Sequence, residues 1–159
     1  MASRKFLILL LASAFIAASC NQIVLWKPQQ QAQPEEAQPI IEIGGKELTV
    51  ELADTVEKQL LGLSGRESLP QNGGMLFIFS ESHRYTFWMK NMNFPLDIIW
   101  IKDGRVFEIN ANAQPEPGVK DSELKIFIPS QAVDRVLEVN AGWTSENNIN
   151  PGDEVMFRF

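Results

Sequence analysis

The chain has 159 residues, a length that predicts one domain with its own hydrophobic core. Its 20 acidic residues outnumber the 14 lysines and arginines, so no basic stripe is present that would bind nucleic acid. A single cysteine excludes an internal disulfide, and one cysteine with one histidine excludes the usual zinc-ligand sets. We therefore expect no metal site and no cofactor.

Residues 1–19 are typical of an export signal. Two basic residues, at positions 4 and 5, precede an apolar run over residues 6–18 that is too short to span a bilayer. Residues 17–20, Ala-Ala-Ser-Cys, resemble the lipobox of bacterial lipoproteins, in which the cysteine receives lipid and becomes the mature N-terminus. The sequence therefore predicts lipid attachment at Cys20. The alternative is a plain secretory signal that leaves Cys20 as a free thiol or removes it.

Residues 20–39 are predicted to form a disordered tether. The part from Lys27 to Pro39 is rich in proline, glutamine and glutamate and contains no apolar residue larger than alanine. Such a segment cannot bury enough surface to offset the entropy lost on ordering. We expect a folded domain over residues 40–159, held by this tether at a membrane on the periplasmic or extracellular side of the cell envelope.

Short strands with turn signals at close intervals follow in the folded domain. Gly44-Gly45 and Asp103-Gly104 are typical of two-residue hairpin turns. Strands are predicted over residues 40–43, 46–53, 75–79, 84–90, 96–101, 105–110, 124–128, 133–140 and 155–159.

Two short helices complete the predicted elements. The first is capped by Asp54 or Thr55, has Val56, Leu60 and Leu63 at i, i+4 and i+7, and ends at Gly65. The second covers about residues 143–147. The strand-rich pattern predicts a mainly β fold: a single jelly-roll-like β-sandwich or a partly closed barrel of about eight to nine short strands, with one or two short helices.

Residues 84–101 are the densest block of aromatic and β-favouring residues, and we expect the domain to be organised around them. Read with period two, odd-numbered residues from 85 to 89 point one way and even-numbered residues from 84 to 90 point the other. Trp88 therefore lies on a polar face. One interpretation is a platform of Trp88, Arg84, Lys90, Asn91 and Asp97 that holds a polar or anionic ligand. The other is that Trp88 covers a sheet edge and its neighbours are ordinary strand-end polar groups.

Six sequence blocks stand out in the predicted domain: GLSGRESLP (62–70), GMLFIF (74–79), FWMKN (87–91), PLDII (95–99), LEVNAGW (137–143) and PGD (151–153). Together they resemble the bacterial and archaeal domain-of-unknown-function family numbered 192. The resemblance spans roughly Ile40 to Phe159. It implies a compact, mainly β, jelly-roll-like domain and supplies no activity.

The polar motif positions of that family in this chain are Arg66, Lys90, Asn91, Asp97 and Glu138. The resemblance thus adds Arg66 and Glu138 to the candidate ligand-binding residues. A structural ion pair of Arg66 with Asp97 or Glu138 is the alternative.

Three classes of function remain open. We favour a binding module, in which Trp88 stacks on a polar or anionic small molecule or a glycan. Hydrogen bonds to this ligand would come from Arg66, Lys90 and Asn91. This hypothesis expects the candidate residues to line one cavity. The second class is an envelope enzyme that uses Lys90 and Asp97 for acid–base chemistry. The third is a structural or assembly lipoprotein with an exposed apolar patch and a protein partner of unknown identity.

Overall fold

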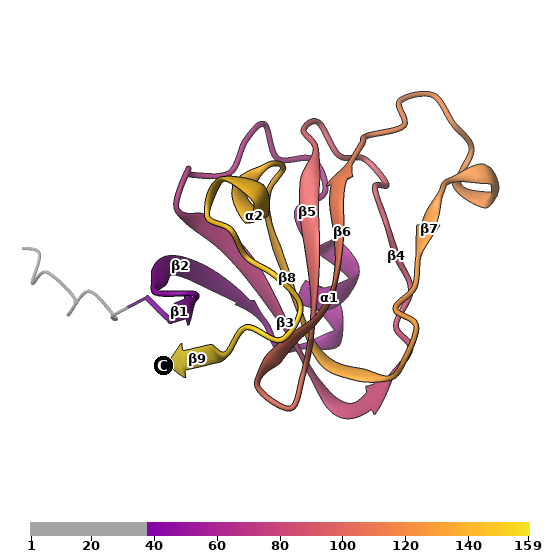
Figure 1. Ribbon diagram of the computed structural model, residues 1–159. Coiled ribbons are helices and arrows are strands. Elements are labelled where there is room, and N and C mark those ends of the chain that lie inside the picture. Colours follow the sequence, from indigo (N-terminus) through magenta and orange to yellow (C-terminus); the bar gives the residue numbers. More distant parts are fainter. Residues whose placement is uncertain (1–37) are drawn as a thin grey trace, which may run out of the picture. The chain divides into compact units, whose positions relative to one another are not determined.

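The computed structural model describes residues 38–159. The predicted signal peptide, Cys20 and the predicted tether up to residue 37 lie outside the described residues. The described part of the chain is mainly β, as predicted, with nine strands and two short α-helices (Figure 1). In chain order the elements are β1 (Ile40–Ile43), β2 (Lys46–Ala53), α1 (Val56–Leu61), β3 (Gly73–His83), β4 (Phe87–Trp88), β5 (Leu96–Lys102), β6 (Arg105–Ala113), the 3₁₀ turn η1 (Asp121–Glu123), β7 (Ile126–Phe127), β8 (Val133–Asn140), α2 (Trp143–Glu146) and β9 (Val155–Arg158).

Seven of these strands form one curled sheet in the order β6-β5-β8-β3-β2-β1-β9. Neighbours are antiparallel except β2 and β3, which run parallel and are connected through α1. The two edge strands approach each other again, because Arg105 of β6 forms an antiparallel bridge with Glu154, next to β9. The Val106 backbone N–H also donates to the Asp153 carbonyl at 2.9 Å. Of the two predicted architectures, the sheet is therefore the partly closed barrel.

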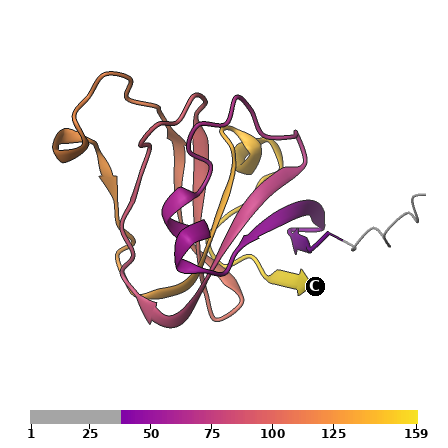
Figure 2. The same ribbon diagram turned by 180° about the vertical axis from the view of Figure 1, so that it is seen from behind.

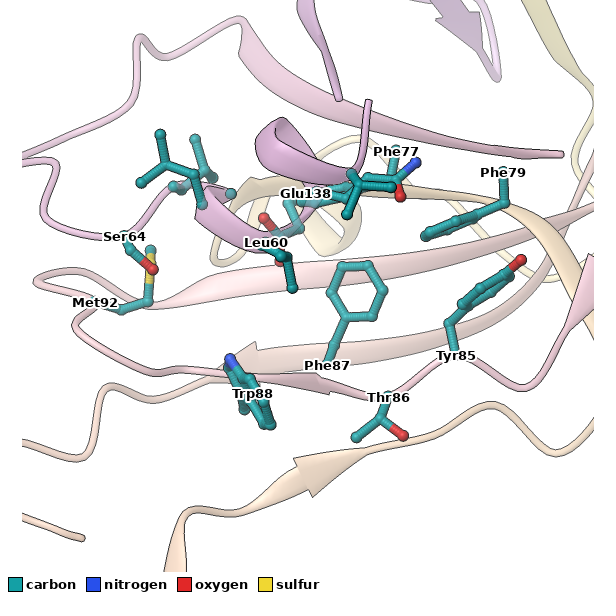
Figure 3. A pocket seen from close by; sticks show the side chains of 15 residues that line it. Leu60, Ser64, Phe77, Phe79, Tyr85, Thr86, Phe87, Trp88, Met92 and Glu138 are labelled. Carbon is teal, nitrogen blue, oxygen red and sulfur yellow. The ribbon is translucent and has the colours of Figure 1, made fainter. Parts of the chain in front are cut away.

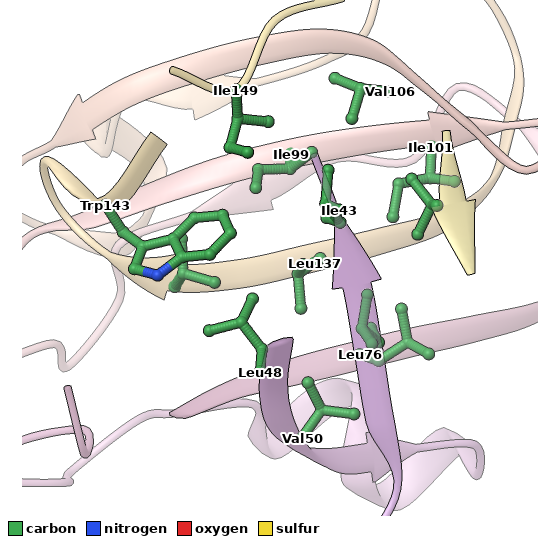
Figure 4. Close-up of a cluster of buried hydrophobic side chains, with 13 residues drawn as sticks. Ile43, Leu48, Val50, Leu76, Ile99, Ile101, Val106, Leu137, Trp143 and Ile149 are labelled. Atoms are coloured by element: carbon green, nitrogen blue, oxygen red, sulfur yellow. The ribbon is translucent and has the colours of Figure 1, made fainter. Parts of the chain in front are cut away.

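The inside of the barrel is filled by apolar side chains from alternate strand positions (Figure 4). Leu76 of β3, Ile99 of β5 and Leu137 of β8 are fully buried there, and Trp143 of α2 joins the same cluster. Burying a side chain of this size stabilises a fold by about 1.5–3 kcal/mol. This inner cluster explains why apolar residues occupy alternate positions along the strands.

The outer face of the same strands carries a second buried cluster that includes Phe77, Ile98 and Trp100. It is covered by the α1 region and by a two-stranded ribbon of β4 and β7, which lie next to each other outside the curled sheet (Figure 2). Phe87 of β4 packs edge-on against Phe77 and Trp100, with ring centroids 4.9 and 5.4 Å apart. Both faces of β5 are thus buried, which is why it reads as a nearly continuous apolar run.

Both predicted hairpin turns are confirmed. Gly44 and Gly45 have φ angles of 56° and 73° and join β1 to β2. Asp103 and Gly104 have φ angles of 51° and 70° and join β5 to β6. Two successive positive φ angles match the twist of the flanking strands, so these residue pairs fix the register of both hairpins.

The predicted strands 84–90 and 124–128 are much shorter in the structure. Only Phe87–Trp88 and Ile126–Phe127 pair, with each other, in the covering ribbon. The predicted alternation still holds, because Met89 is buried and Trp88 is 49% exposed. The stretch 84–101 is therefore not the centre of the domain as a whole: its second half is β5, an interior strand next to the edge strand β6, and its first half covers the sheet.

Helix α1 ends earlier than predicted, and the side chains of this helix that were predicted to face the core are exposed. Thr55 caps it by accepting a hydrogen bond from the Lys58 backbone N–H, as predicted, but its C-cap is Gly62 and not Gly65. Leu63 is buried, whereas Val56 and Leu60 are 65% and 78% exposed. The i, i+4, i+7 spacing is wrong as a core signal, because the two members within α1 are exposed and the buried member, Leu63, lies beyond the helix end.

Candidate functional site

A cavity of about 280 Å³ lies between the outer face of the sheet and its cover (Figure 3). Leu60 comes from α1, Phe77 from β3, Phe87 and Trp88 from β4, and Glu138 from β8. This volume is near the lower end of the range of small-molecule sites. The full lining is Val56, Gln59, Leu60, Leu61, Gly62, Leu63, Ser64, Phe77, Phe79, Tyr85, Thr86, Phe87, Trp88, Met92 and Glu138.

Glu138 is the charged residue of this lining. It lies in the middle of the sheet, between Met75 of β3 and Ile98 of β5, and is only 5% exposed. Within residues 38–159 no side chain or backbone group hydrogen-bonds its carboxyl group, and burial alone raises its pKa to about 8. At neutral pH the group is therefore mostly protonated, and it has free hydrogen-bonding capacity facing a cavity.

Aromatic rings form much of the remaining wall. Phe79 and Tyr85 stack with ring centroids 3.6 Å apart, and Phe87 meets Phe77 edge-on. The Tyr85 hydroxyl group donates to the Glu81 carbonyl at 2.6 Å. The rings are thus held in place by their own contacts, so the cavity is largely pre-formed.

The rim of the cavity is apolar and open to solvent. Val56, Leu60 and Leu61 of α1 are between 64% and 78% exposed, and Trp88 faces them from β4 at 49%. Leucines on a short surface helix are normally turned inward. Their exposure around an opening is typical of a ligand or partner site.

A second cavity, of about 390 Å³, lies on the other side of Met92, which lines both. Lys90 and Asn91 line it, and the Lys90 ammonium group is paired with Asp121 at 2.5 Å. The wall between the cavities is tied together by the Ser64 hydroxyl group, which donates to the Lys90 carbonyl at 3.0 Å. This second cavity is more polar than the first and already contains a charge pair.

The predicted candidate residues do not line one cavity. Trp88 and Glu138 line the first, and Lys90 and Asn91 line the second, while Arg66, Arg84 and Asp97 line neither of the two. The reason is that β4 and β5 belong to different layers, although they are adjacent in sequence. The candidate residues are therefore not on one shared platform, and four of them divide between two neighbouring cavities.

The two arginines have partners of their own. Arg66 makes a bidentate pair with Glu51, at 2.5 and 2.7 Å, which lowers the pKa of Glu51. The predicted alternative of an ion pair of Arg66 with Asp97 or Glu138 is therefore wrong. The Arg84 side chain donates from Nε to the Pro129 carbonyl at 2.8 Å.

Asp97 is fully buried and has a structural explanation. Its carboxyl group accepts hydrogen bonds from the backbone N–H groups of Asn112, Gly142 and Thr144, at 2.8, 3.2 and 3.0 Å, and from the Thr144 hydroxyl group at 2.6 Å. These contacts anchor the start of α2 to β5. Acid–base chemistry by Asp97 with Lys90 has no support in this geometry.

Sequence reasoning missed most of the first cavity. Leu60, Ser64, Phe87 and Met92 carry no chemical signal of their own. A signal was present at Glu138, which is an acidic residue inside the run Val-Leu-Glu-Val of a strand that is buried on both faces. Such a position is unusual for an unpaired charge and points to a function.

Two further searches cover residues 38–159. No group of three or more histidine, cysteine, aspartate or glutamate residues is arranged there to hold a metal ion. Neither helix in this part of the chain is long and apolar enough to cross a membrane.

Fold and site together define a mainly β barrel domain with a small apolar cavity on its outer face. The chain belongs to the DUF192 family, described as "Uncharacterized ACR", whose model matches residues 39–157. No match was found among curated proteins.

Two solved structures are similar to this chain, each with 33% sequence identity. One is a protein from Sinorhizobium meliloti 1021 with the provisional description of transcription regulator; the TM-score is 0.68, and the match covers 76% of this chain and 94% of that chain. The other is a protein of unknown function from Novosphingobium aromaticivorans DSM 12444, with a TM-score of 0.67 and coverage of 78% and 89%.

Proposed function

We propose that this protein is a binding module whose site is the Glu138 cavity. The ligand is a small, largely apolar molecule that places one polar group on the Glu138 carboxyl group. The observation that carries this proposal is a carboxyl group, 5% exposed and without a hydrogen-bond partner in the described chain, that faces a cavity of about 280 Å³. The Glu138 oxygens are not among the fully buried side-chain atoms without a partner, so the carboxyl group is accessible from the cavity and a ligand there can hydrogen-bond it.

The ligand proposed from the geometry differs from the one expected from the sequence. An anionic ligand held jointly by Arg66, Trp88 and Lys90 is less well supported, because both cations already pair with carboxylates. Binding of nucleic acid is not part of the proposal, since acidic residues outnumber basic ones.

We also propose that the domain is exported and tethered to a membrane in the cell envelope through lipid on Cys20. The support is the sequence of residues 1–20, with its basic start, short apolar run and lipobox-like end. Mass spectrometry of the mature N-terminus tests this part. An unmodified Cys20, or a mature chain that starts after it, would contradict it.

Ligand binding can be tested with N-phenyl-1-naphthylamine, a neutral probe whose fluorescence rises in apolar sites. We expect the purified protein to bind the probe and Ser64→Trp, which fills the cavity, to weaken binding about tenfold or more, the equivalent of ~1.4 kcal/mol. Ser122→Trp is the matched control, because Ser122 is exposed on η1 and lines neither cavity.

A second variant that blocks the cavity keeps the test valid if Ser64→Trp does not fold. Thr86→Trp changes an exposed residue of the same lining, so the fold should tolerate it. Circular dichroism would confirm that both variants are folded. Probe binding that survives both blocking variants would refute the cavity as the site.

The exposed rim favours one other candidate, a structural or assembly role. In that case a protein partner would cover Val56, Leu60 and Leu61, which are each more than 60% exposed. Leu61→Ser would then abolish partner capture, whereas Ser64→Trp, which fills the cavity, would leave partner capture unchanged. The binding module instead predicts that function depends on the interior of the cavity and is lost in Ser64→Trp.

A further inference from the structure

The charge pattern of the Glu138 cavity restricts the chemistry of its ligand. Among its lining residues Glu138 is the charged group, and Tyr85 is the other titratable one. Two charged residues of the covering helix, Glu57 and Lys58, do not line the cavity, and Lys58 is paired with Asp54 at 2.7 Å. The flanking strands contribute Met75 and Ile98 on either side of Glu138. Within the described chain, therefore, no positively charged side chain of the lining, the covering helix or the flanking strands faces this carboxyl group.

The aromatic wall adds a second restriction. The rings of Phe77, Phe79, Tyr85, Phe87 and Trp88 line the same cavity as the carboxyl group (Figure 3). The faces of aromatic rings carry negative partial charge and attract cations, by about 0.5–2 kcal/mol each. Aromatic rings that line a cavity together with a single carboxyl group are typical of sites that bind organic ammonium groups.

We propose that the ligand of this cavity is a small organic amine, bound as a cation with its ammonium group on Glu138 and its apolar body against the aromatic wall. The proposal rests on the proposed function and names the ligand class of that site. The alternatives of the same size are a neutral alcohol and an anionic carboxylate. An alcohol gains little from the rings, and a carboxylate would be repelled by the ionised form of Glu138.

Binding of a cation releases a proton from the protein, whereas binding of an alcohol does not. Below pH 8 the Glu138 carboxyl group holds a proton in the empty cavity, because burial raises its pKa to about 8. An ammonium ion binds the ionised carboxylate, so one proton leaves to solvent for each amine bound. The affinity for an amine should therefore rise by about tenfold per pH unit from pH 6 to about 8 and then level off.

Three ligands with matched chains test the proposal: hexylamine, hexan-1-ol and hexanoate, measured by displacement of N-phenyl-1-naphthylamine from the purified protein at pH 8. We expect hexylamine to bind about tenfold or more tightly than hexan-1-ol, as charge-assisted hydrogen bonds exceed neutral ones. Hexanoate should bind most weakly. Calorimetry at pH 6.5 in buffers of different ionisation enthalpy should show release of nearly one proton per hexylamine bound.

Glu138→Gln is the decisive variant because it keeps the shape and removes the charge. It should lose the preference for hexylamine over hexan-1-ol, whereas Ser122→Trp, which lines neither cavity, should keep that preference. Measurements on the wild-type protein alone also test the cation proposal. If hexan-1-ol displaces the probe as well as hexylamine does, the cation proposal is wrong while the binding module stands. If the wild type binds neither probe nor amine, the proposed function itself is refuted.

Discussion

Two buried carboxyl groups lie on neighbouring strands and face opposite sides of the same sheet. Asp97 of β5 pairs with Val139 and belongs to the inner face of the barrel, whereas Glu138 of β8 pairs with Ile98 and belongs to the outer face. Both are at most 5% exposed. Asp97 accepts four hydrogen bonds, and Glu138 accepts none within the described chain.

The difference shows that burial of a charged side chain does not by itself mark a functional site. Buried polar groups are almost always hydrogen-bonded, and a group that satisfies this rule needs no ligand to explain it. Asp97 satisfies it with donors that hold α2 in place. Glu138 has no partner within the described chain and its carboxyl group opens on the cavity, where a ligand would supply one. Replacing each carboxyl group by its amide isostere separates the two cases.

The largest effect is expected for Asp97→Asn. The amide offers one acceptor oxygen in place of two, so at least one of the donors from Asn112, Gly142 and Thr144 is left buried without a partner. We expect the free energy of unfolding to fall by about 3–5 kcal/mol, measured by urea denaturation. Asp103→Asn is the matched control, because asparagine suits the positive φ angle of 51° in that turn. A loss below about 1 kcal/mol would mean that the Asp97 hydrogen bonds are not structural.

Glu138→Gln should act in the opposite direction and only at higher pH. Burial raises the pKa of Glu138 from 4.5 to about 8, so the folded protein keeps a proton that the unfolded chain loses near pH 4.5. The contribution of this group to stability is thus complete below pH 4.5, declines as pH rises and is lost above about 8. At pH 8 the amide should stabilise the fold by between about 1 and 4 kcal/mol, and at pH 4 it should be neutral.

Urea denaturation of both proteins across pH 4–9 measures this difference. Glu67→Gln is a control for the same chemical change at an exposed position that lines neither cavity. Parallel stability profiles for wild type and Glu138→Gln would show that Glu138 titrates normally. That result would remove the physical distinction between the two buried carboxyl groups.

Much of the fold could be predicted from local sequence, because hairpin turns and alternation are local properties. Gly44-Gly45 and Asp103-Gly104 fixed two hairpins, and the apolar runs of β3, β5 and β8 reflect burial on both faces. Where the predicted secondary structure was wrong, contacts between distant segments determined which residues form strands. The segment 84–90 has strong β propensity, yet only Phe87–Trp88 finds a partner strand, because β7 is just two residues long.

The site could be predicted only in part, because a cavity depends on contacts between layers. Trp88, Lys90 and Asp97 are close in sequence, and period-two reasoning treats them as one surface. The chain turns at Asn91, whose positive φ angle of 54° breaks that continuity, and Asp97 then enters the sheet from another layer. Glu138 came from the family resemblance. Its missing hydrogen bonds are a three-dimensional property that no pattern in the sequence contains.

The smallest effect is expected for Asp121→Asn, which applies the same isosteric change to an exposed, paired carboxylate. Asp121 contacts Lys90 at 2.5 Å, but the side chains are 70% and 37% exposed. Solvent screens such a pair, so the loss of stability should be at most about 0.5 kcal/mol in urea denaturation and should shrink further in 1 M salt. Hexylamine binding should not change, because Asp121 lines only the second cavity. If Asp121→Asn weakened hexylamine binding as much as Glu138→Gln does, the two cavities would be acting as one site, and the missing partner of Glu138 would no longer single it out.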